Sequence, residues 1–513
     1  MSSDRRRPTG PDQVPLLEVS ASRRPPQPEA VPATASGIAP TRASLPWSPD
    51  QAELLPARVR EVLGEENLAC VLLDMREQLD FSAVVASDKS DVGRPGYSPV
   101  MMTLLLIYAY ARGVHSSREI ERRCTTDLGF RYIAGGYRPD HSRICEFRTQ
   151  HLEAFKALFL QTLRLAQAAK LVSLGHIAVD GSKFLANASK HKAMSYGRMD
   201  PAVEQLDRQI KQLIQEAEAI DAEEDRRYGD QRGDELPPEI ADPKERKRAF
   251  AEAKQRLKAA EVDQKMDLVE EKGERIAKIE EAKAALEEAA REKAKAEEKP
   301  EETAVPDEKA QRNFTDPDSR IMPKSGAKGG FVQAYNVQAA VDADSQIIVA
   351  QEVVQAANDK EQLLPMVEQV IANTGKVPKQ VSADNGYLSE DQVTSVEGIG
   401  VEAFVAPGRQ KHGETQGTPR GRPAEALTWA ERNARKLNGR RGKRIYSRRK
   451  VTVEPTFGQI KNRGFRGFSL RGLANVRGEM ALVCAVHNLL KLIRAKLKAE
   501  TTPPTLLLPA ATG

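Results

Sequence analysis

The spacing of hydrophobic residues divides the chain into segments of different character. Over residues 46–170 they recur every three or four positions, as in Leu104, Leu105 and Tyr108, which is the period of helices that bury one face. Residues 1–45 are rich in Pro, Ser, Ala and Arg and have no such period. We therefore expect a disordered tail followed by an N-terminal helical domain.

The pattern then changes to one of alternating strands and helices. Residues 171–200 contain an apolar strand that ends at Asp180, and the alternation resumes after residue 313 and extends to residue 495. In this second part we expect strands at 331–341 and 347–354, a helix at 358–373, a strand at 380–384, a helix at 390–396 and a strand at 401–405. This order predicts the first part and the remainder of one α/β core with a mixed sheet.

A long charged segment interrupts this core. Residues 201–312 are dominated by residues that favour helices, and glycines and prolines break the pattern near Tyr228–Pro238. Two long helices are therefore expected as an insertion, with no chemistry of their own. Residues 407–450 are predicted to be a basic loop, and 496–513 a flexible tail.

Composition and charge narrow the class of protein. The chain has 513 residues, 40% hydrophobic and 29% charged, with a net charge of +5, which suits a soluble protein of two to four structural units. The 5% aromatic content does not favour an aromatic-lined single-strand binder. The four cysteines, at positions 70, 124, 145 and 484, show no zinc spacing and are expected to be reduced and buried.

The chain shows no targeting or membrane signal. No apolar stretch follows the arginines of the N-terminus, and the longest apolar run, Val100–Ala111, is shorter than the roughly 20 residues that span a bilayer. A cytoplasmic location without membrane contact is expected. In the N-terminal helical domain, Arg118, Arg122, Arg123, Arg143 and Arg148 could dock on DNA, or could be ordinary surface arginines of a helical bundle.

Two aspartates end predicted strands. An acid at the end of an apolar strand is costly to bury unless it binds a cation or is paired, and Asp180 and Asp384 both occupy such a position. Cleavage of a phosphodiester with two divalent ions needs a few convergent carboxylates. The alternative for either aspartate alone is an ordinary turn residue.

A third acid lies in a basic segment. Pro455 favours a first helical turn, so a helix is expected to begin near Glu454, and Lys461 is two turns further on the same face. An acid and a base on one stripe can serve a metal ion and a phosphate together. The alternative is a surface ion-pair stripe.

The segment from Tyr446 to Lys461 resembles the signature helix of insertion-sequence DDE transposases, in which Tyr, Arg, Glu and Lys follow at near-fixed spacing. Here these positions fall on Tyr446, Arg449, Glu454 and Lys461. The gap from arginine to glutamate is one residue longer than the commonest form, and strict spacing would select Lys450 instead.

Further motifs of this resemblance occur in the family's order. Asp180 in AVDGSKF looks like the family's first catalytic aspartate, and Asp384 in SADNGYLS looks like the second. The long insertion, the TDPDSR segment at 315–320 and the AVHNLLKL motif resemble in particular the insertion-sequence family numbered 1182. The resemblance spans roughly residues 50–495.

The resemblance implies an RNase H-like catalytic domain that depends on Mg²⁺, with Mn²⁺ as a possible substitute. It implies cleavage at the inverted-repeat ends of double-stranded DNA and transfer of the strand to a target, by a homo-oligomer on paired ends. By analogy Asp180 and Asp384 share a metal ion and Glu454 holds a second. The residues implied to position DNA are Tyr446, Arg449 and Lys461.

The basic segment favours DNA independently of the resemblance. From Arg409 to Lys450 there are fourteen Lys and Arg against three Glu. Such a segment, including Arg440, Arg441 and Lys443, is expected to bind the DNA backbone in the nucleoid, although a solvated linker would have the same composition. Two alternatives to an active transposase remain: a transposase-derived DNA-binding protein without catalysis, and an RNase H-like nuclease that cuts without transfer.

Overall fold

The computed structural model describes residues 58–87, 96–228, 243–296, 300, 304–323, 330–407 and 427–501. They belong to one compact unit that begins at Pro56. The tail expected at 1–45 and most of the tail expected at 496–513 lie outside these residues, as does the first half of the expected basic loop. Residues 496–501 are the end of a helix.

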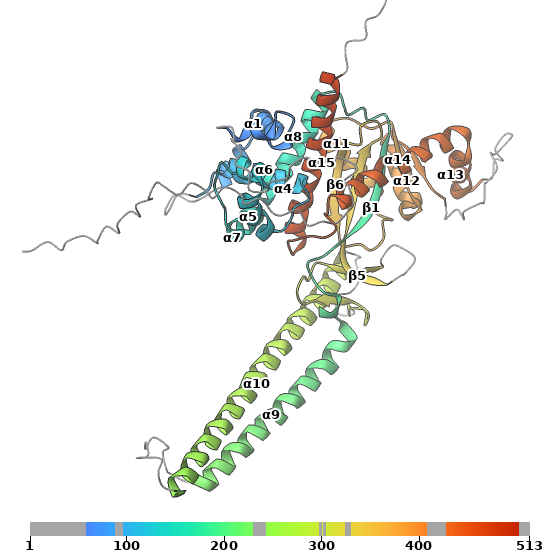
Figure 1. Cartoon of the computed structure of the whole chain (residues 1–513). Helices are drawn as coiled ribbons and strands as arrows, with labels where there is room; N and C mark the ends of the chain where they lie inside the picture. The colour runs from blue at the N-terminus through green and yellow to red at the C-terminus, as the bar shows by residue number, and fades with distance from the viewer. Residues whose placement is uncertain are drawn as a thin grey trace, which may run out of the picture. The chain divides into compact units, whose positions relative to one another are not determined.

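The N-terminal part of this unit is helical, as the hydrophobic period predicts (Figure 1). Polar side chains start several of the helices: Asp127 and Asp140 each accept hydrogen bonds from backbone N–H groups of the first turn that follows. The helices are α1 (Val59–Leu63), α2 (Leu68–Asp74), α3 (Ser82–Ser87), α4 (Pro99–Ala111), α5 (Ser117–Thr126), α6 (Leu128–Ile133), α7 (His141–Gln150) and α8 (Leu152–Ala168).

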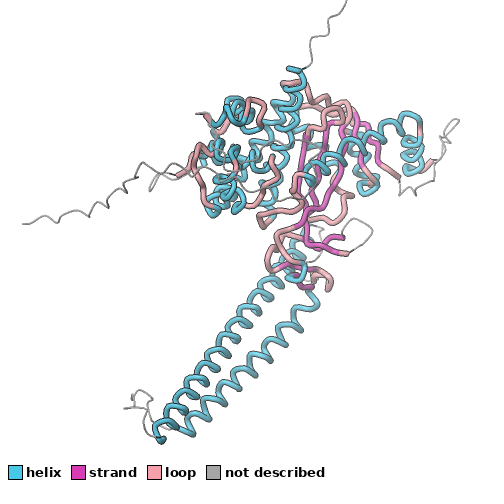
Figure 2. Tube along the Cα trace, viewed as in Figure 1, coloured by secondary structure: helices cyan, strands magenta, loops and turns pink. Residues whose placement is uncertain are grey.

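The remainder of the core is a mixed sheet (Figure 2). Its strands are β1 (Ile177–Leu185), β4 (Arg320–Pro323), β5 (Phe331–Asp342), β6 (Ile348–Val354), β7 (Gln380–Ala383) and β8 (Glu402–Val405). β5 pairs antiparallel with β1 on one side and with β4 and β6 on the other, while β1, β7 and β8 are parallel. This arrangement confirms the predicted α/β fold with a mixed sheet.

Helices cover both faces of the sheet. Residues of α14 (Arg440–Asn462) and α15 (Leu473–Thr501) share one hydrophobic cluster with Ala178 and Phe184 of β1, while α11 (Leu363–Thr374) and α12 (Glu390–Gly398) share another with Ile177 and Val179. Alternate residues of β1 therefore face opposite layers, as the period of a strand requires.

The insertion is an antiparallel pair of long helices, as predicted. α9 (Met199–Tyr228) and α10 (Pro243–Ala296) run side by side (Figure 1), and a small cluster that includes Met199 and Ile279 joins them near the core. Two short strands that the sequence did not predict, β2 (Ala193–Ser195) and β3 (Gln311–Asn313), pair where the insertion leaves and re-enters the core.

Two predicted helix boundaries are wrong. The expected helix at 358–373 begins only at Leu363, because residues 358–362 form a turn whose polar groups serve the site described below. The predicted basic loop is helical from residue 429 onward: α13 (Trp429–Asn438) begins with a capping box between Thr428 and Glu431, and α14 follows directly.

Pro455 does not start a helix but lies inside α14. A proline in this position leaves the carbonyl four residues earlier without its helical partner. The carbonyl of Val451 accepts a hydrogen bond of 2.9 Å from Gln346 Nε2 instead, and Gln346 adopts a φ of +61° in the turn before β6. The side chain of Gln346, from the turn between β5 and β6, thus lets α14 continue past Pro455.

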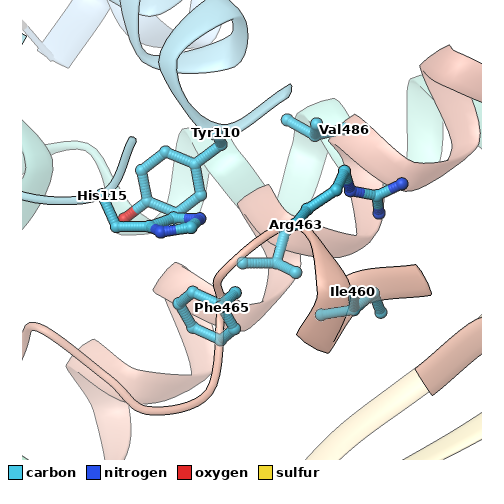
Figure 3. Close-up of a pocket in the computed structure, with 7 residues that line it drawn as sticks. Tyr110, His115, Ile460, Arg463, Phe465 and Val486 are labelled. Carbon is cyan, nitrogen blue, oxygen red and sulfur yellow. The ribbon is translucent and has the colours of Figure 1, made fainter. Parts of the chain in front are cut away.

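The N-terminal helices join the core through a buried polar contact. Glu479 of α15 accepts hydrogen bonds from Tyr110 Oη at 2.8 Å and from the backbone N–H groups of Ser469 and Leu470. Arg148 lies 3.6 Å from the same carboxylate, so it is not free to dock on DNA. Beside this contact is a small cavity whose walls include Tyr110, Arg463 and Val486 (Figure 3).

Three of the four cysteines are buried, and Cys145 is exposed, contrary to expectation. All four are free thiols. Within the described ranges, no helix is both long and apolar enough to cross a membrane.

Candidate active site

Neighbouring strands bring the two predicted catalytic aspartates to one edge of the sheet. β1 and β7 are parallel, with Ala178 opposite Ser382, so Asp180 and Asp384 each lie two residues beyond the last paired position. The Asp384 carboxylate accepts a hydrogen bond of 2.7 Å from the N–H of Gly386. β1 does not end at Asp180, as the sequence predicted, but continues to Leu185 because β5 pairs with it along its whole length. Asp180 therefore lies within β1, beside the carboxyl end of β7 that Asp384 follows.

Helix α14 brings the third acid to the same edge. Arg449 Nη1 donates to Asp180 Oδ2 at 3.1 Å, and Nη2 donates to Glu454 Oε1, also at 3.1 Å. The side chain of Arg449 is only 9% exposed, whereas that of Glu454 is 48% exposed. One guanidinium thus links two of the three predicted catalytic acids.

The charge balance at this edge favours a cation. Burial raises the pKa of Asp180 to about 7, and the charges of Asp384 and Glu454 act in the same direction. Arg449 and the N–H of Gly181 oppose this rise in the pKa. The site therefore holds more negative charge than its own arginine neutralises.

The other signature residues face the same acids. The ring of Tyr446 lies 5.7 Å from the guanidinium of Arg449, and Lys461 Nζ donates a hydrogen bond of 2.6 Å to Ser182 Oγ. Burial lowers the pKa of Lys461 and raises that of Tyr446. Lys450 is exposed, whereas Arg449 is buried and pairs with Asp180.

The basic residues predicted to bind DNA have different surroundings. Arg440, Arg441 and Lys443 lie exposed at the start of α14, and Arg441 pairs with Glu402 at 2.6 Å. Further along the chain, Arg466 and Arg471 are exposed beside the end of β1. By contrast, Arg463 faces the cavity at the N-terminal helices and donates to His487, and Arg477 pairs with Glu352.

Two phenylalanines that lie between these arginines in the sequence are packing residues. Phe465 and Phe468 are 2% and 5% exposed and pack against Phe184. His176 and His487 are buried, and burial lowers the pKa of each, to about 4 and about 3. In the N-terminal helices Arg122 and Arg123 pair with Glu119, and Arg143 with Glu146.

The donor set suits a hard divalent ion. Such ions prefer carboxylate oxygens, and the site offers three acids around a partly buried, strongly negative edge. In the part of the chain that the structure describes, no three acidic, histidine or cysteine side chains lie together closely enough to hold an ion, and Arg449 supplies the positive charge. The three carboxylates have the oxygen ligands and the negative charge that a divalent ion needs, once Arg449 no longer pairs with Asp180 and Glu454.

Sequence reasoning missed one acid beside this site, Asp359. The sequence predicted a helix at 358–373, whereas the structure has Asp359 in the turn after β6, with Asn336 and Gln338 donating to its carboxylate. The available signal was Asn336 and Gln338, two amides in a strand predicted to be buried, because buried amides need hydrogen-bond partners.

Comparison with known proteins agrees with this geometry. A mixed sheet covered by helices, together with a DDE domain, defines a polynucleotidyl transferase of RNase H-like fold. Residues 305–489 match the model of the transposase DDE domain, and residues 61–150 match that of a transposase domain of otherwise undefined role, DUF772. The chain is thus a DNA transposase of the DDE type found in insertion sequences.

The extent of these matches is informative. The DDE match includes Asp384 and Glu454 but begins after Asp180, so the role of Asp180 as the first catalytic aspartate stays a prediction. DDE transposase domains depend on divalent metal ions and act on DNA. No curated protein and no solved structure gives a significant match to the chain.

Proposed function

We propose that this transposase cuts DNA at the ends of its own insertion sequence and joins them to target DNA, with Asp180, Asp384 and Glu454 as the ligands of Mg²⁺. The observation that carries this proposal is the Arg449 bridge between Asp180 and Glu454, beside Asp384. Three elements distant in sequence supply these acids, which a turn aspartate or a surface ion-pair stripe would not require.

Each signature residue has a role that its contacts favour. When bound, divalent ions activate the attacking hydroxyl and neutralise the phosphate. Asp180 is held in place by the N–H of Gly181 at 2.9 Å, and Asp384 by that of Gly386. Arg449 compensates Asp180 and Glu454, and its guanidinium could pair with a DNA phosphate where a divalent ion held these acids instead. Lys461 neutralises a phosphate beside β1.

The exposed cations suggest a path for the DNA. The backbone of Arg466 and Phe468 hydrogen-bonds to Leu185, and Arg471 donates to the carbonyl of Asn187 at 2.9 Å. From Asp180 to Asn187 an extended chain covers about 23 Å, at roughly 3.3 Å per residue. The terminal inverted repeat follows this line, while Arg440, Arg441 and Lys443 contact its backbone further out.

The same proposal covers assembly and location. Transposition joins two ends, and a homo-oligomer on paired ends supplies a catalytic site for each. The enzyme acts in the bacterial cytoplasm, on the nucleoid.

Cleavage of labelled DNA that carries the gene's own flanking ends tests this function. With Mg²⁺ or Mn²⁺ we expect nicking at the element boundary, and Asp384→Asn should abolish nicking while binding persists. An exposed acid of α12, Asp391, provides the matched control Asp391→Asn. Binding by the wild-type protein without cleavage under either ion would favour a DNA-binding relic, and cleavage without joining would favour a nuclease.

A further inference from the structure

Asp359 is fixed beside the acids by two buried amides. Its Oδ1 accepts hydrogen bonds from Asn336 Nδ2 at 2.7 Å and from Gln338 Nε2 at 2.6 Å. Both amides belong to β5 and are at most 1% exposed. The carboxylate is thus held by the sheet itself, although it belongs to the turn between β6 and α11.

A tyrosine sets the orientation of one of these amides. Tyr387 donates its hydroxyl hydrogen to Gln338 Oε1, so the NH₂ group of Gln338 must face Asp359. Burial and the charges of Asp359, Asp180 and Asp384 raise the pKa of Tyr387, which keeps this hydroxyl protonated. Tyr387 is buried and its N–H donates to the carbonyl of Asp384 at 3.3 Å, so one set of hydrogen bonds runs from the backbone of Asp384 through Tyr387 and Gln338 to Asp359.

Two glycines make room for this carboxylate. A Cβ on Gly181 would lie 2.7 Å from Asp359 Oδ1, which is closer than real atoms approach. A Cβ on Gly386 would lie 2.9 Å from Asp384 Oδ1 and 3.3 Å from Asp359 Oδ2. The carboxylates of Asp359 and Asp384 therefore flank the same small space, and each glycine follows a predicted catalytic aspartate closely.

Asp359 reaches this space from the face of the sheet opposite to α14. Gly181 is opposite Gln338 in the register of β1 and β5, so it faces the layer of α11, whereas Asp180 faces Arg449. Within the described part of the chain, neither Asp359 nor Asp384 forms a salt bridge with a lysine or arginine. The arginine thus compensates one side of the acidic edge and leaves the other side negative.

We propose that Asp359 is a fourth acidic residue of the metal site and contributes a carboxylate to ion binding next to Asp384. This inference rests on the proposed function, because it needs an ion between the aspartates. Oδ2, to which no described residue donates a hydrogen bond, borders the space beside Asp384 and is the atom that serves the ion. The amides of Asn336 and Gln338 keep Oδ1 in place and so aim Oδ2.

Titration of the full-length protein with Mn²⁺ in the absence of DNA tests the proposal, with free Mn²⁺ measured by electron paramagnetic resonance. Asparagine at position 359 keeps an oxygen for the two amides and removes the charge of Oδ2. We expect Asp359→Asn to weaken Mn²⁺ binding by about 10-fold or more, in the range found for conserved partners of metal ligands. Asp391→Asn is the matched control and should bind like the wild type.

The Asp384→Asn variant distinguishes a failure of the metal site as a whole from a failure of the role proposed for Asp359. If Asp384→Asn weakens Mn²⁺ binding and Asp359→Asn does not, Asp359 only anchors its turn and the inference is wrong. If neither substitution changes Mn²⁺ binding, both the proposed metal site and the proposed role of Asp359 in it are wrong. Should the asparagine variant fail to fold, Asp359→Ser keeps a smaller acceptor for the amides and is judged by the same titration.

Discussion

Two arginines of this transposase bind carboxylates, and their surroundings differ in a way that separates structure from function. At the junction of the N-terminal helices with the core, Arg148 and Glu479 are 1% and 0% exposed, and Glu479 is saturated by three further donors. At the acidic edge, Asp180 and Glu454 are 16% and 48% exposed and share Arg449. At the junction, the single carboxylate of Glu479 has several donors. At the acidic edge, two carboxylates share one guanidinium.

The difference shows how a charge pair can be interpreted from structure. A buried carboxylate with a full set of donors stabilises a junction and has no capacity for a ligand. Where burial and neighbouring acids raise the pKa of a carboxylate, its ionised form destabilises the folded protein. A bound cation removes this destabilisation. Removing charge from the two clusters should therefore change stability in opposite directions.

The largest effect is expected at the junction. Glu479→Gln would leave Arg148 as an uncompensated buried charge, which costs about 3–5 kcal/mol in the free energy of unfolding. Chemical denaturation of the full chain measures this loss. The control is Glu402→Gln, whose surface pair with Arg441 contributes about 1 kcal/mol or less. A junction variant as stable as the control would show that this pair does not hold the two parts together.

At the acidic edge the opposite sign is expected. Because the folded pKa of Asp180, about 7, exceeds its usual 3.8, its contribution to stability is fully present below about pH 4 and is lost as the pH rises through 7. Without divalent ions, Asp180→Asn should exceed the wild type in stability by on the order of 2–4 kcal/mol at pH 8, from roughly 1.4 kcal/mol per unit of pKa.

Thermal and denaturant unfolding in EDTA between pH 4 and pH 8 checks this prediction. The stability difference between Asp180→Asn and the wild type should widen steadily with rising pH and then level off. A difference that is independent of pH, or a variant that is less stable at pH 8, would mean that Arg449 fully compensates the site.

A smaller effect concerns DNA rather than folding. Replacing Arg440, Arg441 and Lys443 with glutamine should weaken binding to all sequences alike and reduce the slope of log affinity against log salt by about two to three. The matched control removes the same charge from exposed residues of the helical insertion, at Arg208, Lys211 and Arg275. Equal slopes for the two triple variants would exclude the start of α14 from the interface.

Much of the fold could be predicted from the sequence because its strands are regular. β5, β6, β7 and β8 follow apolar runs bounded by turn residues, and the long insertion consists of strong helix formers. The strands β2, β3 and β4 were missed, because strands of three or four half-polar residues show no clear alternation.

The remaining errors have a common cause in tertiary contacts. Pro455 indicated a helix start, but the hydrogen bond from Gln346 to Val451 lets α14 continue through it. Asp359 lay in a segment with a good helical pattern, and only the amides of β5 pull it into a turn at the acidic edge. Local sequence does not contain such partners, which come from elements that are distant in the chain.

Metal-ion rescue of an Asp180→Cys variant tests the central claim most directly, because Asp180 lies outside the segment that matches the DDE domain. Cys145 is exposed and is replaced by serine in every protein, and Asp391→Cys is the control. A thiolate is a poor ligand for hard Mg²⁺ and a better one for softer ions such as Mn²⁺. We expect Asp180→Cys to be inactive in Mg²⁺ and to recover cleavage of the element ends in Mn²⁺. Cleavage equal to that of the control in Mg²⁺ would show that Asp180 does not bind the ion.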